Sequence, residues 1–469
     1  MERKIKKDSQ KDLYKNSGKR FRIRLSTTQK IMLSFLLAIL VGSVLLSLPV
    51  SSADGRAVPY IDALFMATTS VCVTGLVTMP TVSTWSIFGQ IVILILIQMG
   101  GLGIITILAG VMIGLHKKIG IGERILIQDA FNLNTLSGMV TFIKKVLIGT
   151  FIVEGIGAIL YMIVFVPDFG PRGIWISIFN SVSCFCNAGI DIIAENSLCD
   201  YVKNPLVNIV TCLLIFVSGI GYIVWWDMLN CLKNRKSKKL KCFRGLTLHS
   251  KIALWVTFIL IFTGAVATFV FEYNNPLTMK DFSLFEKIQA SVFQSVTTRT
   301  AGFATLPQEN LTNATSVVAM LLMFIGGSPV GTAGGVKTVT IAVLVVSAFC
   351  TIKGKEDVSL FNRTISKQAV SKAVAVVCMS FIIMFFSTVF LAAVTETDIL
   401  NIMYETVSAT ATVGLSKNLT SSLNLWGKII IIITMYLGRV GPISLVIALN
   451  TRRLKNNIIK NPTEIISIG

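Results

Sequence analysis

The chain has 469 residues, of which 53% are apolar and only 14% are charged, and it carries a formal net charge of +20. Soluble domains carry about 25% charged residues, so this composition excludes a soluble multidomain protein and predicts a membrane protein. Nine cysteines and two histidines show no metal-binding spacing, and we therefore expect neither a zinc site nor an enzyme.

Eight apolar segments are long enough to cross the hydrocarbon layer of a bilayer, which is about 30 Å thick. In chain order they are residues 31–50, 86–115, 146–167, 206–226, 252–271, 315–349, 369–394 and 428–449. The first follows a polar, basic tail at residues 1–30. With 20 residues it exceeds the ~7–15 residues of a signal-peptide core, so we expect a retained span.

The basic residues lie almost entirely on one side of these spans. Thirty-three of the 43 Lys and Arg residues fall in residues 1–30, 116–145, 229–251, 351–372 and after 450. The positive-inside rule then predicts that both termini are cytoplasmic. The net charge reflects topology, and we expect no nucleic-acid partner. The basic Lys233–Lys241 loop would contact either a regulatory partner or anionic lipid headgroups.

Four shorter, semi-apolar stretches lie on the opposite side. They are Tyr60–Ser70, Trp175–Ser183, Leu284–Val296 and Ile402–Thr410. Each has about 9–13 residues, too few to cross a bilayer, and is expected to be re-entrant. Each runs into a motif that ends in glycine, at Gly75, Gly189, Gly302 and Gly414, with separations of 114, 113 and 112 residues. This period predicts four parallel repeats around an axis normal to the membrane.

The predicted fold is an all-α polytopic membrane protein with four parallel helix–pore loop–helix repeats, eight spans in all, around a pseudo-fourfold central pore. The repeats are expected at residues 31–115, 139–230, 250–350 and 368–450, followed by a cytoplasmic tail at 451–469. Four non-helical loops that meet on an axis can direct backbone carbonyls at a dehydrated cation, and glycine permits the required positive φ. A single glycine is as well explained by a tight turn, but four at one period favour a filter. The predicted filter residues are Val73, Thr74, Gly75, Asn187, Ala188, Gly189, Thr300, Ala301, Gly302, Thr412, Val413 and Gly414.

The sixth span contains five glycines and a proline between Gly326 and Gly335. Such a segment cannot form a good helix, and irregular backbone at membrane depth should line a cavity. The alternative is a kinked helix packed on small residues.

Several charged residues lie within the spans or beside the filter motifs. Arg439 lies midway along the last span, where a charge indicates function. We expect it to bind carbonyls of the broken loop and to oppose cations. Arg299 should point away from the pore, with Glu405 as one candidate counter-charge. Glu154 is left without a role.

The motif Phe293–Phe303, together with Asn187–Gly189, Ala411–Gly414 and Val73–Gly75, resembles the filter motifs of the Trk/Ktr/HKT superfamily of potassium transporters. The resemblance covers nearly the whole chain. Trk-type members carry two further N-terminal helices, so the chain is most similar to KtrB, the membrane subunit of bacterial Ktr systems. A serine at the first filter glycine goes with sodium selectivity in plant relatives, so Gly75 favours potassium.

The resemblance implies potassium uptake across a bacterial cell membrane, with K⁺ bound at the filter carbonyls, no covalent cofactor and Na⁺ as a candidate activator. It also implies a homodimer with a KtrA-like nucleotide-binding ring on the cytoplasmic face. The broken sixth span becomes an intramembrane gate. The predicted gate residues are Gly326, Gly327, Ser328, Pro329, Gly331, Thr332, Gly334, Gly335 and Arg439. One departure is Ile190-Asp191, where the family commonly has phenylalanine; Asp191 either adds charge at the outer mouth or faces water.

Other classes of protein explain the sequence less well. A secondary transporter of another solute would not need four glycine-terminated re-entrant segments. A pump would need a nucleotide or phosphorylation domain, and the predicted cytoplasmic loops reach only about 25–30 residues. A purely structural protein explains neither the period nor Arg439. The remaining alternative is a sodium-permeable or Na⁺/K⁺-transporting member of the same superfamily.

Overall fold

The computed structural model describes residues 26–117, 119–131, 138–233, 245–355 and 357–441. The described chain is helical apart from loops and one small hairpin, β1 (Ser359–Leu360) and β2 (Arg363–Thr364). Several predictions lie outside the described residues: most of the tail 1–30, the Lys233–Lys241 loop beyond its first residue, the end of the last span and the tail 451–469.

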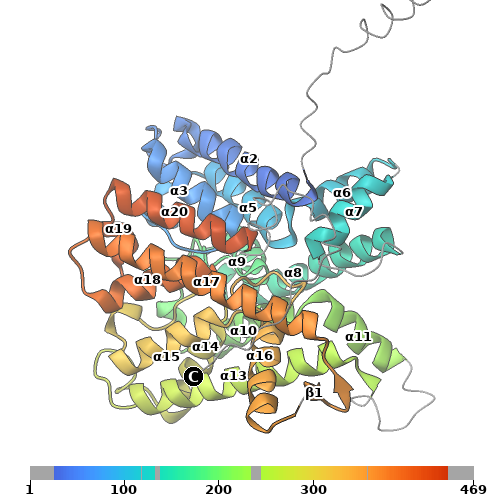
Figure 1. Cartoon of the computed structure of the whole chain (residues 1–469). Helices are drawn as coiled ribbons and strands as arrows, with labels where there is room; N and C mark the ends of the chain where they lie inside the picture. Colours follow the sequence, from blue (N-terminus) through green and yellow to red (C-terminus); the bar gives the residue numbers. More distant parts are fainter. Residues whose placement is uncertain (1–25, 118, 132–137, 234–244, 356, 442–469) are drawn as a thin grey trace, which may run out of the picture.

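Each of four repeats begins with a long helix that packs on a shorter one. The long helices are α2 (Thr27–Ser47), α8 (Met139–Phe169), α13 (Leu248–Glu272) and α17 (Lys367–Val394), and all four are long and apolar enough to cross a membrane. The shorter ones, which we call the pore helices, are α3 (Tyr60–Cys72), α9 (Arg172–Cys186), α14 (Leu284–Thr297) and α18 (Ile399–Ala411). In Figure 1 the first repeat (blue) lies above the fourth (orange to red), with the third (yellow-green) below.

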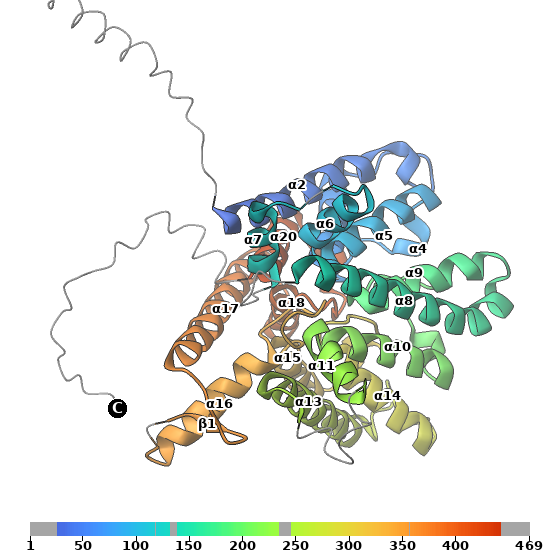
Figure 2. The ribbon, with the colours of Figure 1, turned by 90° about the vertical axis from the view of Figure 1, so that its right-hand side faces the viewer.

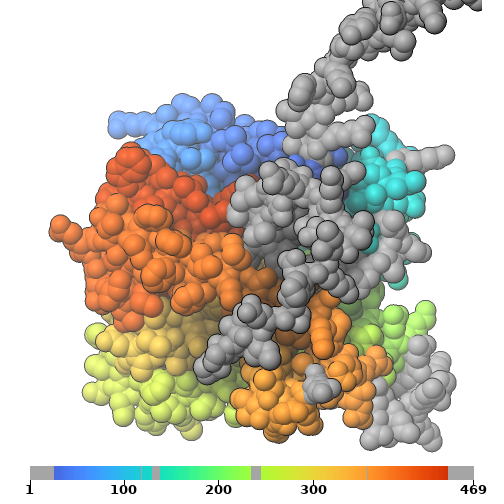
Figure 3. All heavy atoms as spheres, viewed as in Figure 1, coloured from blue at the N-terminus to red at the C-terminus, as the bar shows by residue number. Residues whose placement is uncertain are grey.

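A third helix follows each pore helix and reaches the neighbouring repeat. These are α5 (Ile87–Leu102), α10 (Pro205–Gly219), α15 (Asn313–Phe324) and α20 (Leu425–Val440). Helix α5 packs on α9, α10 on α14, α15 on α18, and α20 returns to α3. The repeats therefore form a closed ring in chain order, as the two perpendicular views show (Figure 1 and Figure 2). On the face in Figure 3 the blue helices of the first repeat touch the red helices of the fourth.

Each of these third helices begins at a side chain that caps its first turn. Ser86, Asn204, Thr312 and Asn424 accept hydrogen bonds from backbone N–H groups of α5, α10, α15 and α20 respectively. The first turn of a helix has N–H groups without intrahelical partners, and such caps contribute about 1 kcal/mol each. The caps fix where each helix leaves its loop.

Three of the third helices turn or break at glycine. Helix α5 turns by 100° at Gly103 into α6 (Ile104–Gly114), and α10 turns by 95° into α11 (Tyr222–Lys233) near Gly221. Helix α15 is followed by an irregular segment, residues 325–337, and then by α16 (Thr338–Ile352). The sequence indicated only the last of these breaks. If each bent pair counts as one span, up to six spans pass a test of length and composition among the described residues, and the eight-span topology stays a prediction.

The remaining described helices are short and lie between these elements. They are α4 (Thr81–Thr84), α7 (Ile121–Phe131) and α19 (Leu419–Ser422), with single 3₁₀ turns at Pro49–Ser51, Cys199–Tyr201 and Gln308–Asn310. Most residues of each pore helix are buried, whereas the long helices expose large apolar side chains such as Trp255, Phe258 and Phe262. Apolar residues on the outside and polar residues inside are what a lipid environment requires.

Candidate functional site

The C-terminal ends of the four pore helices share one backbone geometry. A left-handed residue directly follows α3, α9 and α18, with φ of 55° at Val73, 58° at Asn187 and 51° at Thr412, and another comes three residues after α14, with φ of 68° at Thr300. Two residues later comes a glycine with positive φ, at 102°, 64°, 83° and 101° for Gly75, Gly189, Gly302 and Gly414. Only glycine adopts such angles without strain. We call residues 73–75, 187–189, 300–302 and 412–414 the filter loops.

The four glycines converge on one point. A methyl group placed on Gly75 would lie 3.1 Å from the Cα atoms of both Gly189 and Gly414. One placed on Gly302 would lie 3.0 Å from the Cα of Gly189 and 3.2 Å from that of Gly414. Each glycine thus has two others beside it, as at the corners of a square. The structure brings together four residues that the sequence spreads over more than 300 positions.

The carbonyl groups before the glycines follow the same ring. A methyl group on Gly75 would lie 2.7 Å from the Ala188 carbonyl oxygen, and one on Gly189 would lie 2.8 Å from that of Ala301. Gly302 meets the carbonyl of Val413 in the same way, and Gly414 meets that of Thr74. Each filter loop therefore presents a carbonyl oxygen to the glycine of the preceding loop. The first loop presents its carbonyl to the glycine of the fourth, which closes the ring.

A serine or threonine near the end of each pore helix holds its filter loop in place. Thr69 Oγ1 accepts from Gly75 N at 2.9 Å, and Ser408 Oγ accepts from Gly414 N at 3.0 Å. In the second repeat Ser183 Oγ accepts from Ile190 N at 3.2 Å, and in the third Thr297 Oγ1 donates to the Phe303 carbonyl at 2.6 Å. Sequence reasoning missed these four clamps. Their signal was a hydroxyl residue five or six positions before every filter glycine.

The atoms at this ring that could bind an ion are carbonyl and hydroxyl oxygens. The hydroxyls of Thr74 and Thr412 are buried without a hydrogen-bond partner in the described part of the chain. No cluster of His, Cys, Asp or Glu suited to a transition metal occurs among the described residues. Carbonyl and hydroxyl oxygens without a carboxylate suit a weakly hydrated monovalent cation, whose water shell they can replace.

The segment 325–337, which we call the intramembrane loop, is tied to the break in the second repeat. Ser328 N donates to the Gly219 carbonyl at 2.8 Å, and Tyr222 N donates to the Val330 carbonyl at 3.0 Å. The neck of the loop is closed by a bond of 3.0 Å from Gly326 N to the Val336 carbonyl. Two interrupted helices therefore satisfy each other's free backbone groups.

A cavity of about 690 Å³ adjoins the loop. Its lining includes Pro329, Gly331, Gly334 and Gly335 from the loop, and Thr410 and Ala411 from the end of α18. Two cationic side chains, Arg439 and Lys337, also line it, and none of the described residues around it is a carboxylate. This space is electropositive, in contrast to the uncharged filter ring.

The Arg439 guanidinium bridges the loop and the first repeat. Its Nη1 donates to the Thr332 carbonyl at 2.9 Å, and its Nη2 donates to the Gly100 carbonyl at 2.5 Å. The sequence predicted contact with loop carbonyls but not the bond to Gly100. Lys337 Nζ donates to the Ala333 carbonyl of the loop at 2.5 Å. Both cations thus bind carbonyls of the intramembrane loop.

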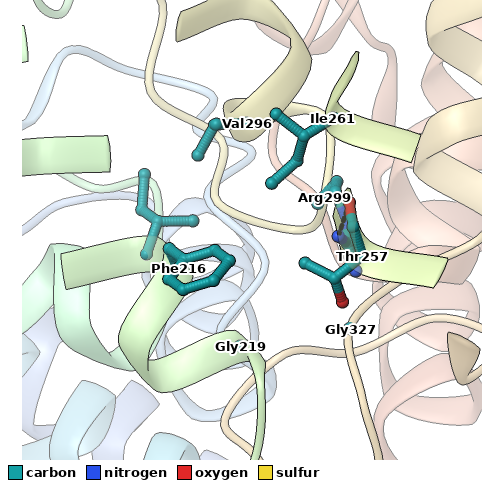
Figure 4. A pocket seen from close by; sticks show the side chains of 8 residues that line it. Phe216, Gly219, Thr257, Ile261, Val296, Arg299 and Gly327 are labelled. Atoms are coloured by element: carbon teal, nitrogen blue, oxygen red, sulfur yellow. Dashed lines mark hydrogen bonds between the residues drawn. The ribbon is translucent and has the colours of Figure 1, made fainter. Parts of the chain in front are cut away.

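Arg299 points behind the third filter loop, as expected. Its guanidinium donates to the carbonyls of Thr257 and Gly326, at 3.2 Å in each case. Figure 4 shows the side chain beside a small cavity of about 20 Å³. The suggested counter-charge, Glu405, is wrong: that carboxylate accepts instead from the hydroxyls of Ser416 and Thr420. Backbone carbonyls rather than an acid hold the guanidinium.

The two other carboxyl groups that the sequence analysis singled out, Glu154 and Asp191, are also buried. Both oxygens of Glu154 accept from Gln98 Nε2, at 3.1 and 3.2 Å. Asp191 is 9% exposed and accepts from Ser197 Oγ at 2.7 Å, so it does not face water. Burial raises the pKa of Asp191 to about 6, although the bonds from Ser197 and the backbone act in the opposite direction.

The chain matches the model of the TrkH family, described as cation transport proteins, over residues 11–456. It is 39% identical to the potassium/sodium uptake protein NtpJ of Enterococcus hirae, over 96% of this chain and 99% of that protein. It is 38% identical to the Ktr system potassium uptake protein B of Bacillus subtilis, over 90% and 93% of the two chains. The crystal structure of the potassium transporter TrkH from Vibrio parahaemolyticus has a TM-score of 0.72 at 16% identity, covering 92% of this chain and 86% of that one, and shares the fold.

Proposed function

Because the chain belongs to the TrkH family of cation transport proteins, we propose that it is the pore-forming subunit of a Ktr-type potassium uptake system. The observation that carries the proposal is the closed ring in which each filter loop presents a carbonyl to the preceding glycine. A relative named as a potassium uptake protein, at 38% identity, and one named as a potassium/sodium uptake protein, at 39% identity, support the choice of potassium as substrate.

In this proposal the carbonyl oxygens of Thr74, Ala188, Ala301 and Val413 replace the water shell of K⁺. Such a filter needs no side-chain charge, because four carbonyl dipoles act on one ion. The C-terminal ends of the four pore helices, which carry partial negative charge, all lead into this ring of filter loops. The Ser/Thr clamps hold the loops open when no ion is present.

The intramembrane loop acts as the gate in this account. An ion that leaves the filter enters the cavity lined by Arg439 and Lys337, where two positive charges oppose it. The loop glycines Gly326, Gly327, Gly331, Gly334 and Gly335, with Ser328, Pro329 and Thr332, allow that segment to move. Displacement of the loop together with Arg439 opens the path.

The assembly and its placement also belong to the proposal. We infer a homodimer in a bacterial cell membrane, with both termini cytoplasmic and a KtrA-like nucleotide-binding ring on the inner face. A relative named as protein B of a Ktr system supports a partner subunit. The exposed aromatic side chains of α13 suit lipid contact. K⁺ is the substrate, Na⁺ a candidate activator, and no covalent cofactor is required.

The alternative is transport of sodium as well as potassium. It is supported by the relative named potassium/sodium uptake protein. Glycine at position 75 favours potassium, by resemblance to the plant transporters in which serine at that place goes with sodium.

The test is rubidium uptake by a bacterium that lacks its own potassium uptake systems, with the chain expressed alone and together with a KtrA-like subunit. We expect saturable uptake that K⁺ inhibits and Na⁺ does not. Uptake inhibited equally by both ions would favour the alternative. Good expression with no cation flux in either condition would contradict the proposal.

A further inference from the structure

The intramembrane loop touches the filter itself. Asn187, the left-handed residue of the second filter loop, donates from Nδ2 to Thr332 Oγ1 of the intramembrane loop at 3.0 Å. The same hydroxyl donates to the Phe185 carbonyl at the end of α9, at 3.1 Å. One hydroxyl thus acts as acceptor and donor at once, as its chemistry allows. Asn187 is 1% exposed and Thr332 is fully buried, so water does not compete for these bonds.

Corresponding positions in two other filter loops also meet the intramembrane loop. Thr300 Oγ1 accepts from Gly334 N at 3.2 Å. A methyl group on Gly334 would overlap Thr412 Oγ1 and would lie 2.7 Å from the Ala411 carbonyl. The first repeat has Val73 at this position, which offers no side-chain hydrogen bond. The intramembrane loop is therefore seated against three of the four filter loops.

Asn187 is well placed to transmit a movement of the intramembrane loop. It lies two residues before Gly189, and its backbone φ is 58°. Its Oδ1 accepts from Ser218 Oγ at 3.4 Å, so the amide is held between α10 and the intramembrane loop. Thr332 is in turn fixed through its carbonyl by Arg439. A continuous set of bonds therefore runs from the cavity arginine to the second filter loop.

We propose that the hydrogen bond between Asn187 and Thr332 couples the intramembrane loop to the second filter loop, so that the loop sets ion preference as well as flux. The inference rests on the proposed function. When the intramembrane loop moves, the Asn187 amide loses its buried partner and the second filter loop relaxes. Coupling of this kind is reciprocal, so an ion bound in the filter also favours the seated loop.

The test measures rubidium uptake and its inhibition by sodium for Thr332→Val, Thr332→Ser, Asn187→Leu and the double variant Asn187→Leu/Thr332→Val. We expect Thr332→Val to reduce the preference for rubidium over sodium about fivefold, the factor that one ordinary hydrogen bond provides. Thr332→Ser, which keeps the hydroxyl, should retain the wild-type preference. The double variant should lose less preference than the sum of the two single variants, because both remove this bond while each also removes one bond of its own.

The matched control is Thr338→Val. Its hydroxyl bonds Ser328 of the intramembrane loop at 3.0 Å, and within the described residues it has no hydrogen bond to a filter loop. The variant should therefore alter the uptake rate without changing the preference. A wild-type preference that Thr332→Val leaves unchanged would overturn the coupling alone. A wild-type chain with no preference among cations would instead overturn the proposed function.

A second measurement covers variants that reach the membrane but do not transport. In purified protein, K⁺ should raise Tm more than Na⁺ does. This difference should shrink equally in Thr332→Val and in Asn187→Leu. If Thr332→Val kept the wild-type difference between the Tm increases caused by K⁺ and Na⁺, the coupling would again be overturned.

Discussion

Lys428 Nζ lies 2.5 Å from Asp62 Oδ1 and joins helix α20 to the first pore helix, across 366 residues of sequence. The contact ties the fourth repeat to the first, where the chain itself provides no connection between neighbours. Both side chains are mostly buried, with 16% and 9% of their surfaces exposed. A buried pair is costly to break from one side, because one charge is left without a partner.

We therefore expect Lys428→Met or Asp62→Asn alone to lower stability by about 1–3 kcal/mol, while the double variant recovers part of the loss. Thermal unfolding followed by intrinsic fluorescence gives the stability of the wild type, the two single variants and the double variant, which together form a double-mutant cycle. Lys280→Met, at an exposed lysine, serves as the control. Strictly additive losses would show that the pair does not join the two repeats energetically.

Neutralisation of Arg439 is expected to increase flux. Arg439→Gln removes a positive charge from the cavity and the bridge between Thr332 and Gly100, so rubidium uptake should rise severalfold. Arg439→Lys keeps the charge but cannot bond both carbonyls as the guanidinium does, and should give an intermediate rate. Initial uptake rates at matched expression check this order. Unchanged rates in both variants would argue against a barrier at this residue.

Arg299 should support the third filter loop from behind. Arg299→Met leaves the carbonyls of Thr257 and Gly326 without their donor, at a cost of about 1–3 kcal/mol for each buried group left unpaired. We expect a lower Tm and a weaker preference for rubidium over sodium. A lower Tm with an unchanged preference would limit the residue to a structural role.

Asp191 should make stability depend on pH. Its pKa in the folded protein is about 6, above the ~3.9 of a free aspartate, so the folded state binds the proton more tightly. The resulting stabilisation is complete below about pH 4 and is lost as the pH rises through 6. Asp191→Asn should therefore gain in Tm relative to wild type between pH 4 and pH 7. Tm values at several pH values test this, with Asp54→Asn as an exposed control. A difference in Tm independent of pH would contradict it.

The ring of filter loops could be predicted because its signal is periodic in sequence. Gly75, Gly189, Gly302 and Gly414 recur at a near-constant interval, and the need for positive φ is local to each residue. The direction of the Arg299 side chain was predictable from charge alone, because a cationic side chain facing the pore would repel the ion. The eight-span topology and the repeat boundaries remain predictions.

The turns at Gly103 and Gly221 could not be predicted from hydropathy. Apolar residues lie on both sides of each turn, so an average over a window does not register a 100° change of direction at one residue. The Asp62–Lys428 pair and the Asn187–Thr332 bond were missed because they join positions distant in sequence. Nothing in the pattern of either segment identifies the other. Glu405 was misassigned because charge alone suggested a partner, whereas two neighbouring hydroxyls satisfy it.

The most direct test of the central claim, that four equivalent glycines form one potassium filter, is the preference for rubidium over sodium in four single variants. These are Gly75→Ser, Gly189→Ser, Gly302→Ser and Gly414→Ser. Gly155→Ser is the matched control, because a side chain at that helical glycine would have no atom within 4 Å. The account predicts that each of the four filter variants weakens or abolishes the preference while the control retains it. Selective uptake that persists when Gly302 or any of the other three is replaced would contradict it.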